Sequence, residues 1–360
     1  MLSARRGGLE QSLVDYCEAL LAERHPVEAI VHPRWPGRAA LERLPLAALA
    51  DLRSWHERDP LAVHRLRSRL SASSPEVVLT IGRRASVLTR RARQALPPLP
   101  QVGVTPNYSI APLLGLDHAI ATTEHLRRAL LAAGQPADRI TVVPNLVRVP
   151  AQIAETARST APVIGALGRL IERKGFADLL EAAALLATRG HRFELRLGGS
   201  GPEQAALETL ARRLGLAAQV RFPGWVADQR SFFAGLDVCC VPSRQEPFGI
   251  VVLEAMAHAR AVVATAAAGP REIVSHRVDG LLVPPGDPPA LAGALAALLD
   301  DPSLRARLAR AGRETARARY DLPVVARQIS AVLCRMAPLR DDPESPIVAV
   351  GPQRPSHLLV

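Results

Sequence analysis

The chain has 360 residues, of which 48% are hydrophobic and only 3% aromatic, and its formal net charge is +11 with a pI of about 10.8. This length and apolar content predict a globular protein with two aliphatic cores. No run approaches the roughly 18 to 20 apolar residues that a membrane-spanning helix needs, and the start lacks the apolar block of a signal peptide. The positive charge favours acidic partners such as nucleotides or anionic lipid headgroups.

The first half of the chain alternates a helical pattern with short β-branched runs. Residues 11–24 place apolar side chains on one helical stripe, and strands are expected at 27–32, 76–82, 101–105, 118–123 and 140–147. Alternation of this kind is typical of βα units around a parallel sheet. It predicts a doubly wound α/β domain over residues 1–150.

The start of this domain is unusual. A doubly wound domain begins with a central strand, followed by a glycine turn and a helix, whereas this chain opens on the turn itself at Gly7 and Gly8. Residues 1–6 are too few and too polar to form that strand. We therefore expect the first strand to be missing because the true start of the chain lies upstream. The alternative is a domain built with a hole in its sheet.

The pattern restarts after a stretch of small and polar residues, 151–161, which predicts a linker. Strands are expected at 163–167, 192–197, 220–222, 237–241, 261–264 and 280–283. With their intervening helices they predict a second doubly wound domain over residues 162–320. A helix at 321–335 is expected to pack back on the first domain, and the tail at 336–360, with five prolines, is expected to be disordered.

Lys174 is the only lysine among 45 basic residues. Lysine is a compact point charge, whereas arginine is a broad planar fork, so a lysine kept in an arginine-rich chain predicts contact with a phosphate oxygen. The alternative is a chance survivor on a solvated helix face. Lys174 follows Arg169 and the strand at 163–167, which places both cations at the carboxyl edge of the sheet, where ligands bind.

The most specific pattern is E-P-F-G-I-V-V-L-E, which runs from Glu246 to Glu254 after the strand at 237–241. Pro247 and Gly249 allow a tight turn, and the helix that follows presents free N–H groups that suit a negatively charged ligand. Alone, the pattern also fits a capped amphipathic helix. Two further turns at the same edge, G-G-S-G-P at 198–202 and P-G-W-V at 223–226, favour a binding site for a phosphorylated ligand.

Together these motifs resemble the nucleotide-sugar domain of retaining glycosyltransferase family 4, and the resemblance covers about residues 7–320. It includes the G-R-L-x-x-x-K-G block, the G-G-x-G-P turn, the E-x7-E element and the closing G-L-L-V-P-P-G-D at 280–287. Gly7-Gly8 and Val143-Pro144-Asn145 are similar to the family's loops in the first half. The resemblance implies the GT-B architecture, in which two doubly wound Rossmann-like domains face a cleft, the first on the acceptor side and the second binding the nucleotide sugar.

The resemblance also implies roles for individual residues. Arg169 and Lys174 would act on the donor diphosphate as leaving-group charge develops, and Glu246 would hold the donor sugar. The implied donor-binding residues are Gly7, Gly8, Asn145, Gly199, Trp225, Val226, Phe248, Gly249, Ile250, Val251 and Glu254. Retention without a metal or other cofactor is implied, by a front-face displacement in which the leaving diphosphate helps to deprotonate the acceptor. Glu246 as a covalent nucleophile is the alternative.

One position departs from the family. Pro106 precedes Asn107 where relatives often carry a histidine that faces the donor sugar. Proline has no N–H to donate, so either Asn107 takes over or the donor pocket differs. The sequence therefore leaves the sugar open.

The prediction is a metal-independent retaining glycosyltransferase that moves a sugar from a nucleoside-diphosphate-sugar to a glycan or lipid-linked acceptor, in lipopolysaccharide or exopolysaccharide synthesis. The alternatives are a non-catalytic sugar-nucleotide binder and a sugar-nucleotide epimerase of the same architecture. Nucleic-acid binding is not expected, because the arginines at 305–319 are not interleaved with aromatic residues.

The expected location is cytoplasmic, with peripheral contact to anionic membrane. No metal site is expected, since the chain has neither His-x-x-x-His nor Asp-x-Asp. The cysteines are expected to be reduced core residues: Cys17, Cys239, Cys240 and Cys334.

Overall fold

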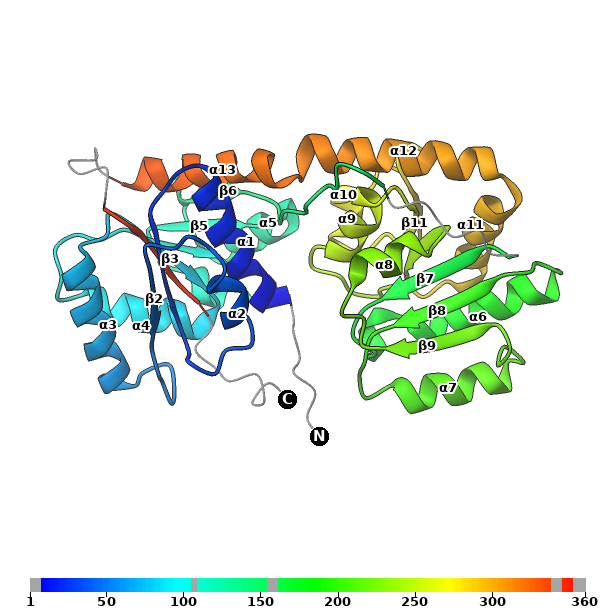
Figure 1. The fold of residues 1–360 in the computed structure, drawn as a ribbon, viewed down its shortest axis with the longest axis horizontal. Coiled ribbons are helices and arrows are strands. Elements are labelled where there is room, and N and C mark those ends of the chain that lie inside the picture. Colours follow the sequence, from blue (N-terminus) through cyan, green and yellow to red (C-terminus); the bar gives the residue numbers. More distant parts are fainter. Residues whose placement is uncertain (1–7, 105–108, 154–160, 338–344, 352–360) are drawn as a thin grey trace. The chain divides into compact units, whose positions relative to one another are not determined.

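The computed structural model describes residues 8–104, 109–153, 161–337 and 345–351. The chain divides into two units, shown in Figure 1. Unit 1 combines Met1–Leu146 with Leu322–Val360, and unit 2 is Val147–Asp321. The C-terminal part of the chain therefore belongs to the same unit as the N-terminal part.

Unit 1 is built on a seven-stranded sheet in the order β2-β1-β13-β3-β4-β5-β6, and all its strand pairs are parallel. The strands are β1 (Val27–Val31), β2 (Ala48–Asp51), β3 (Val78–Ile81), β4 (Gln101–Val104), β5 (His118–Ala121), β6 (Ile140–Val142) and β13 (Ile347–Val350). Except in β2 and β6, every residue of these strands is buried, as expected for a parallel sheet covered on both faces.

Strand β13 lies in the middle of this sheet, where it pairs with β1 on one side and β3 on the other. It holds the central position of the sheet, so the prediction that this sheet lacks its central strand is wrong. The prediction of disorder is likewise wrong for residues 345–351. The prolines of the tail flank the apolar run I-V-A-V without interrupting it, which leaves every N–H of the strand available to the ladder. Figure 1 shows this strand among those from the first part of the chain.

The two faces of β13 contribute to two different cores. Ile347 and Ala349 pack with helices α1 (Gly8–Ala22) and α13 (Leu322–Met336), and Val348 and Val350 pack with α3 (Pro60–Ser73) and α4 (Arg83–Arg93). This alternation is the period of two that a strand imposes on its side chains. Unit 1 also contains α2 (Arg38–Leu41), η1 (Ala111–Leu113), α5 (Glu124–Ala132) and η2 (Ala137–Arg139).

Unit 2 is built on a six-stranded parallel sheet in the order β12-β11-β10-β7-β8-β9. Its strands are β7 (Val163–Leu167), β8 (Glu194–Gly198), β9 (Val220–Gly224), β10 (Val238–Val241), β11 (Ala261–Thr265) and β12 (Leu281–Val283). All six strands predicted for this part of the chain are present, and their bounds differ from the prediction by two residues at most.

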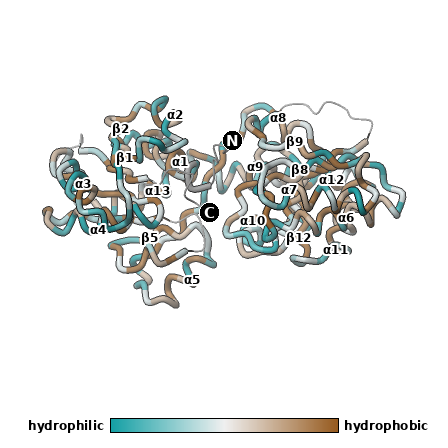
Figure 2. The backbone as a smooth tube through the Cα atoms, turned by 90° about the horizontal axis from the view of Figure 1, so that it is seen from below, coloured by the Kyte–Doolittle hydropathy of each residue, from teal (hydrophilic) through white to brown (hydrophobic). Residues whose placement is uncertain are grey.

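Helices cover both faces of this sheet. One core includes residues of α6 (Phe176–Thr188), α7 (Gln204–Arg213) and α11 (Pro288–Asp300), and the other includes residues of α8 (Gln229–Ala234), α9 (Ile250–Ala257) and α10 (Pro270–Ile273). Helix α12 (Pro302–Arg319) contributes to both cores, through Leu308 and Ala316. Hydrophobic and hydrophilic stretches alternate along the helices in Figure 2, as expected for helices with one face against a sheet.

Among the described helices, none combines the length and apolar content that crossing a bilayer requires.

Candidate active site

The carboxyl ends of β7, β8 and β9 are joined by main-chain hydrogen bonds. The Gly168 N–H donates to the carbonyl of Gly198 over 3.0 Å, and the Gly199 N–H donates to the carbonyl of Gly224 over 2.7 Å. Gly199 has a φ of +129°, and a Cβ atom there would lie 1.8 Å from the carbonyl oxygen of Gly168. Only glycine permits this approach, so the glycine turn packs loop against loop at the carboxyl edge of the sheet.

The loops that follow β7 and β10 are joined in the same way. The Arg244 N–H donates to the carbonyl of Arg173 over 2.9 Å. A Cβ atom on Gly175, whose φ is +67°, would lie 2.0 Å from the carbonyl oxygen of Pro242. These contacts hold the short 3-10 turn η3 (Glu172–Lys174) against the segment that leads to Glu246.

Lys174 and Glu246, 72 residues apart in sequence, meet in an ion pair at this junction. Lys174 Nζ donates to Glu246 Oε2 over 2.5 Å, and the two side chains are 23% and 11% exposed. The Ser243 hydroxyl donates to the same carboxylate oxygen over 3.2 Å. Lys174 is therefore a half-buried, paired cation in a turn and does not lie on a solvated helix face, which argues against the chance explanation.

Further contacts support the segment of Glu246 from the end of β11 and from the loop that follows this strand. The Thr265 hydroxyl donates to the carbonyl of Ser243 over 2.5 Å, and the Gly269 N–H donates to the carbonyl of Glu246 over 2.9 Å. Our sequence reasoning missed Ser243, Thr265 and Gly269. The signal available for Ser243 was a hydroxyl three residues before Glu246 in a turn that directly follows a strand.

Helix α9 begins immediately after Gly249, and no described side chain caps its N-terminus. The first N–H groups of such a helix carry partial positive charge and suit an anion. The Phe248 side chain is buried and contacts the Tyr320 ring edge-on, with 6.4 Å between the ring centroids, so this residue has only its backbone to offer a ligand. Ile250, Val251 and the second-turn residue Glu254 are half-buried.

The other predicted residues of unit 2 lie around the same edge. Arg169 is exposed and forms no side-chain hydrogen bond or ion pair with any residue that the structure describes. Trp225 follows β9 and is 50% exposed. Val226 is partly buried, and its side chain packs beside Gly198, where an added Cβ would lie 2.9 Å from Val226 Cγ2. Val226 is thus held by the core, whereas Arg169 and Trp225 face solvent.

The predicted residues of unit 1 are a separate group. Asn145 is half-buried in the segment after β6, and Gly8 is the first residue of α1. Gly7, Pro106 and Asn107 lie outside the described residues.

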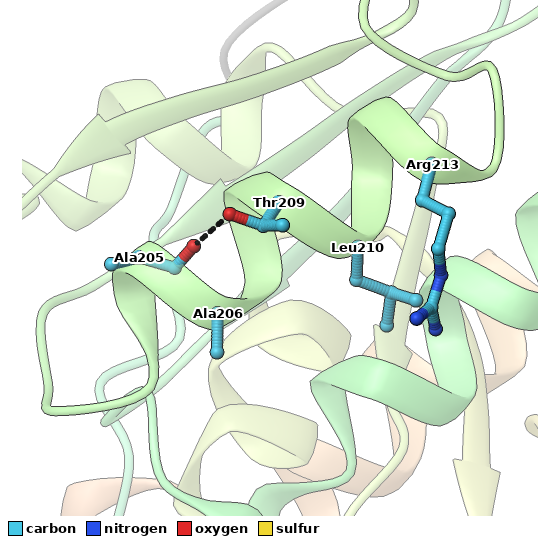
Figure 3. Close-up of a pocket in the computed structure, with 5 residues that line it drawn as sticks. All are labelled: Ala205, Ala206, Thr209, Leu210 and Arg213. Atoms are coloured by element: carbon cyan, nitrogen blue, oxygen red, sulfur yellow. Dashed lines mark hydrogen bonds between the residues drawn. The ribbon is translucent and has the colours of Figure 1, made fainter.

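A hollow in the surface lies over α7, lined by Ala205, Ala206, Thr209, Leu210 and Arg213 (Figure 3). The Thr209 hydroxyl donates back to the carbonyl of Ala205 over 2.9 Å, so it is satisfied within the helix. None of the predicted site residues lines this hollow, and we assign it no role. Within the described ranges, no three His, Cys, Asp or Glu side chains gather as metal ligands would.

The chain is similar in sequence to known proteins. Residues 150–315 match the family model of glycosyl transferases group 1. Over 322 residues the chain is 32% identical to the lipopolysaccharide core biosynthesis glycosyltransferase LpsE of Rhizobium meliloti, covering 86% of this chain and 90% of LpsE. The chain belongs to the group 1 glycosyltransferases.

This glycosyltransferase is also similar to LpsD of Rhizobium meliloti, another lipopolysaccharide core biosynthesis glycosyltransferase, with 37% identity over 186 residues that cover 50% of this chain and 53% of LpsD. Among solved structures, it resembles HepE of Anabaena in complex with UDP-glucose, with a TM-score of 0.79 and 23% identity over 93% of this chain and 98% of HepE. The likeness shows the fold: the predicted GT-B architecture of two Rossmann-like domains is confirmed, with its first strand supplied by β13.

Proposed function

We propose that this protein is a retaining glycosyltransferase of family 4 that transfers a sugar from a nucleoside-diphosphate-sugar to a glycan or lipid-linked acceptor during lipopolysaccharide core synthesis. The contact between Lys174 and Glu246 carries the proposal, because it joins a phosphate-binding cation to a sugar-binding carboxylate at one point of the sheet edge. The names of LpsE and LpsD suggest the pathway, and the UDP-glucose bound to HepE suggests the kind of donor.

Positive charge near the leaving group is the main catalytic contribution in this proposal. An ammonium group has three N–H donors, and Glu246 uses one of those of Lys174, which leaves two for phosphate oxygens. The exposed guanidinium of Arg169 adds a second cation from the same loop. Both stabilise the diphosphate charge that develops as the glycosidic bond breaks, so they act on the transition state more than on the bound substrate.

The remaining groups position the donor. Glu246, held by Lys174 and Ser243, accepts hydrogen bonds from donor-sugar hydroxyls, and Glu254 accepts them from the ribose diol. The uncapped start of α9 binds phosphate through its backbone N–H groups. Trp225 flanks the base. Gly7, Gly8, Gly199, Val226 and Asn145 stay predicted donor contacts.

Retention follows from a front-face displacement in this proposal. The acceptor hydroxyl attacks the anomeric carbon from the side that the diphosphate leaves, and its proton passes to a diphosphate oxygen. Lys174 and Ser243 both donate to Oε2 of Glu246, and this pairing of one carboxylate oxygen favours a role in binding over one as a covalent nucleophile. We propose that Arg169 and Lys174 supply the charge that a metal ion supplies in other transferases, so that no cofactor is needed.

A donor screen tests this function. The purified protein is incubated with UDP-, GDP- and ADP-sugars, with and without a truncated lipopolysaccharide acceptor, and nucleoside diphosphate release is measured. We expect release from one donor, stimulated by acceptor and insensitive to EDTA, with the product anomer matching the donor by NMR. Donor binding without release would indicate a non-catalytic binder, and an epimerised sugar nucleotide would indicate the epimerase.

A lipid-linked acceptor lies at a membrane surface. We therefore also propose that the enzyme is cytoplasmic and makes peripheral contact with anionic lipid there.

A further inference from the structure

Most of the protein's excess charge is concentrated in one part of unit 1. Residues 52–94 contain ten arginines against two glutamates and one aspartate, a net charge of +7 out of the chain's total of +11. This segment consists of the loop after β2, helix α3, strand β3 and helix α4. Neither α3 nor α4 contains an acidic residue. Figure 2 shows hydrophilic colour along both helices.

Pairing within the protein neutralises only some of these arginines. Carboxylates pair with several of them: Glu28 with Arg69, Glu57 with Arg83 and Asp117 with Arg93. Arg53, Arg58 and Arg65 are exposed, and their side chains form no hydrogen bond or ion pair with any described residue. Their charge is available to an external partner.

Two large apolar side chains are exposed in the same segment of the chain, residues 53–65. Trp55 is 89% exposed and Leu61 is 64% exposed. Leu61 and Arg65 are four residues apart on α3 and therefore share one face of that helix. A tryptophan side chain this exposed to solvent is unusual unless a binding partner covers it.

The loop that carries Trp55 is held in place by hydrogen bonds. The buried Asp59 carboxylate accepts hydrogen bonds from the N–H groups of Trp55 and Leu61, each over 3.0 Å. Arg84 Nη1 donates to the carbonyl of Ser54 over 3.0 Å, which ties the loop to α4. These hydrogen bonds fix the main chain of the loop, on which the Trp55 side chain is exposed.

We propose that Arg53, Trp55, Arg58, Leu61 and Arg65 form a face, here called the Trp55 face, that docks on a bilayer containing anionic lipid. The indole ring and Leu61 enter the interfacial region, where tryptophan is favoured, and the arginines bind lipid phosphates. This deepens the proposed function, for which a lipid-linked acceptor supplies the reason to dock. Single-stranded nucleic acid fits less well, because its bases stack on a series of aromatic side chains and this face has one.

Vesicle flotation tests this proposal without donor or acceptor, so its result does not depend on sugar transfer. We expect the protein to float with phosphatidylcholine vesicles only when they contain phosphatidylglycerol, and binding to weaken as salt rises. W55A and the triple variant R53S/R58S/R65S should bind more weakly. Each arginine should contribute about fivefold, the equivalent of ~1 kcal/mol, so the triple variant should lose roughly 100-fold.

Matched controls come from unit 2. V278S removes an apolar side chain that is 60% exposed and is the control for W55A. R310S/R317S removes two exposed arginines of α12 and is the control for loss of charge. Both controls should float as the unchanged protein does. Circular dichroism and the melting temperature establish that each variant is folded.

Three outcomes would overturn the proposal. The first is equal flotation of W55A, the triple variant and the unchanged protein. The second is release of the protein from the vesicles when a single-stranded oligonucleotide is added. The third is intact flotation of W55A with a raised KM for a soluble acceptor, which would make the Trp55 face part of the acceptor site. If flotation follows the expected pattern but no donor releases its diphosphate, the proposed function fails and the docking face stands.

Discussion

Arg244 and Asp178 are joined by two parallel hydrogen bonds, from Nε to Oδ2 over 2.9 Å and from Nη2 to Oδ1 over 2.6 Å. Asp178 is buried in the first turn of α6, directly after the loop of Lys174, and Arg244 lies in the turn that leads to Glu246. The bidentate fork therefore fastens the two loops whose ends form the ion pair between Lys174 and Glu246. We expect the fork to act as a positioning contact, because neither of its residues belongs to the predicted donor contacts.

Replacing Arg244 should lower kcat markedly and change the unfolding free energy only slightly. We expect R244A to reduce kcat about 10- to 100-fold, because small displacements of catalytic groups have effects of this size. R244K should recover little, since lysine keeps the charge without the planar fork. Separate measurements of kcat and KM, with R213A on the exposed face of α7 as control, test this. An unchanged kcat together with a lower unfolding free energy would make the fork merely structural.

Replacing Lys174 should lower kcat much more than replacing Arg244. K174A should lower kcat by roughly 10² to 10³ if the ammonium stabilises the departing diphosphate. K174R should stay well below the unchanged enzyme, because the larger fork has to fit beside Glu246 in a half-buried turn. The neighbouring R173A is the matched control, since only the main chain of Arg173 takes part in the loop contacts. A K174A enzyme with normal kcat would remove Lys174 from the mechanism.

Gly199 should tolerate no side chain. G199A should cost about 3–5 kcal/mol of unfolding free energy. The added Cβ would lie 1.8 Å from the Gly168 carbonyl oxygen, and the alanine would have to adopt a positive φ. Gly190 has a φ of +85° and open space around it, so G190A should cost only about 1–2 kcal/mol. The difference between the two variants in chemical denaturation isolates the contact between the loops. Equal costs would show that the loops can move apart.

Strand β13 should be essential for unit 1. The side chains of Ile347, Val348 and Val350 are at most 3% exposed, and burying each contributes about 1.5–3 kcal/mol, which together approaches the whole stability of a domain. Deleting residues 345–360 should therefore give an insoluble or protease-sensitive protein.

Moving residues 345–360 to a position ahead of Met1 should restore the fold. A strand in the central position normally precedes the first helix of a doubly wound domain, so the rearranged chain follows the usual order. Limited proteolysis and circular dichroism compare the deleted, rearranged and unchanged proteins. A deletion variant that folds and works normally would show that β13 is dispensable.

Cys334 should be the reactive cysteine. The structure corrects the expectation that all four cysteines lie in the core, because Cys334 is exposed on α13, whereas Cys17, Cys239 and Cys240 are buried. Burial, and then the charge of Glu18, raise the pKa of Cys17 to about 12, and burial also raises the pKa of Cys239. A thiol reagent should label Cys334 in the folded protein and the other three only after denaturation, as mass spectrometry would show. Labelling of Cys239 in the folded state would contradict the buried sheet.

Local sequence determined the strands of unit 2 and the edge on which its candidate site lies. Each of those strands is a short run with apolar residues on at least one face that ends at a glycine or polar turn, and the signal is complete within a few residues. Arg169, Lys174 and Glu246 could be assigned to the carboxyl edge because each follows such a run. The direct contact between Lys174 and Glu246 could not be predicted, since it depends on β7 and β10 being neighbours in the sheet.

Only the tertiary structure decided the place of β13 and the supports of the site. The run I-V-A-V, flanked by prolines, carries no local sign that it belongs between two strands from the opposite end of the chain. In the sequence, nothing distinguishes Ser243, Asp178 and Arg244 from other polar residues. Their contacts form only when the loops pack together. The physical reason is that periodicity encodes which face of an element is buried, whereas pairing between distant segments is selected by the free energy of the whole sheet.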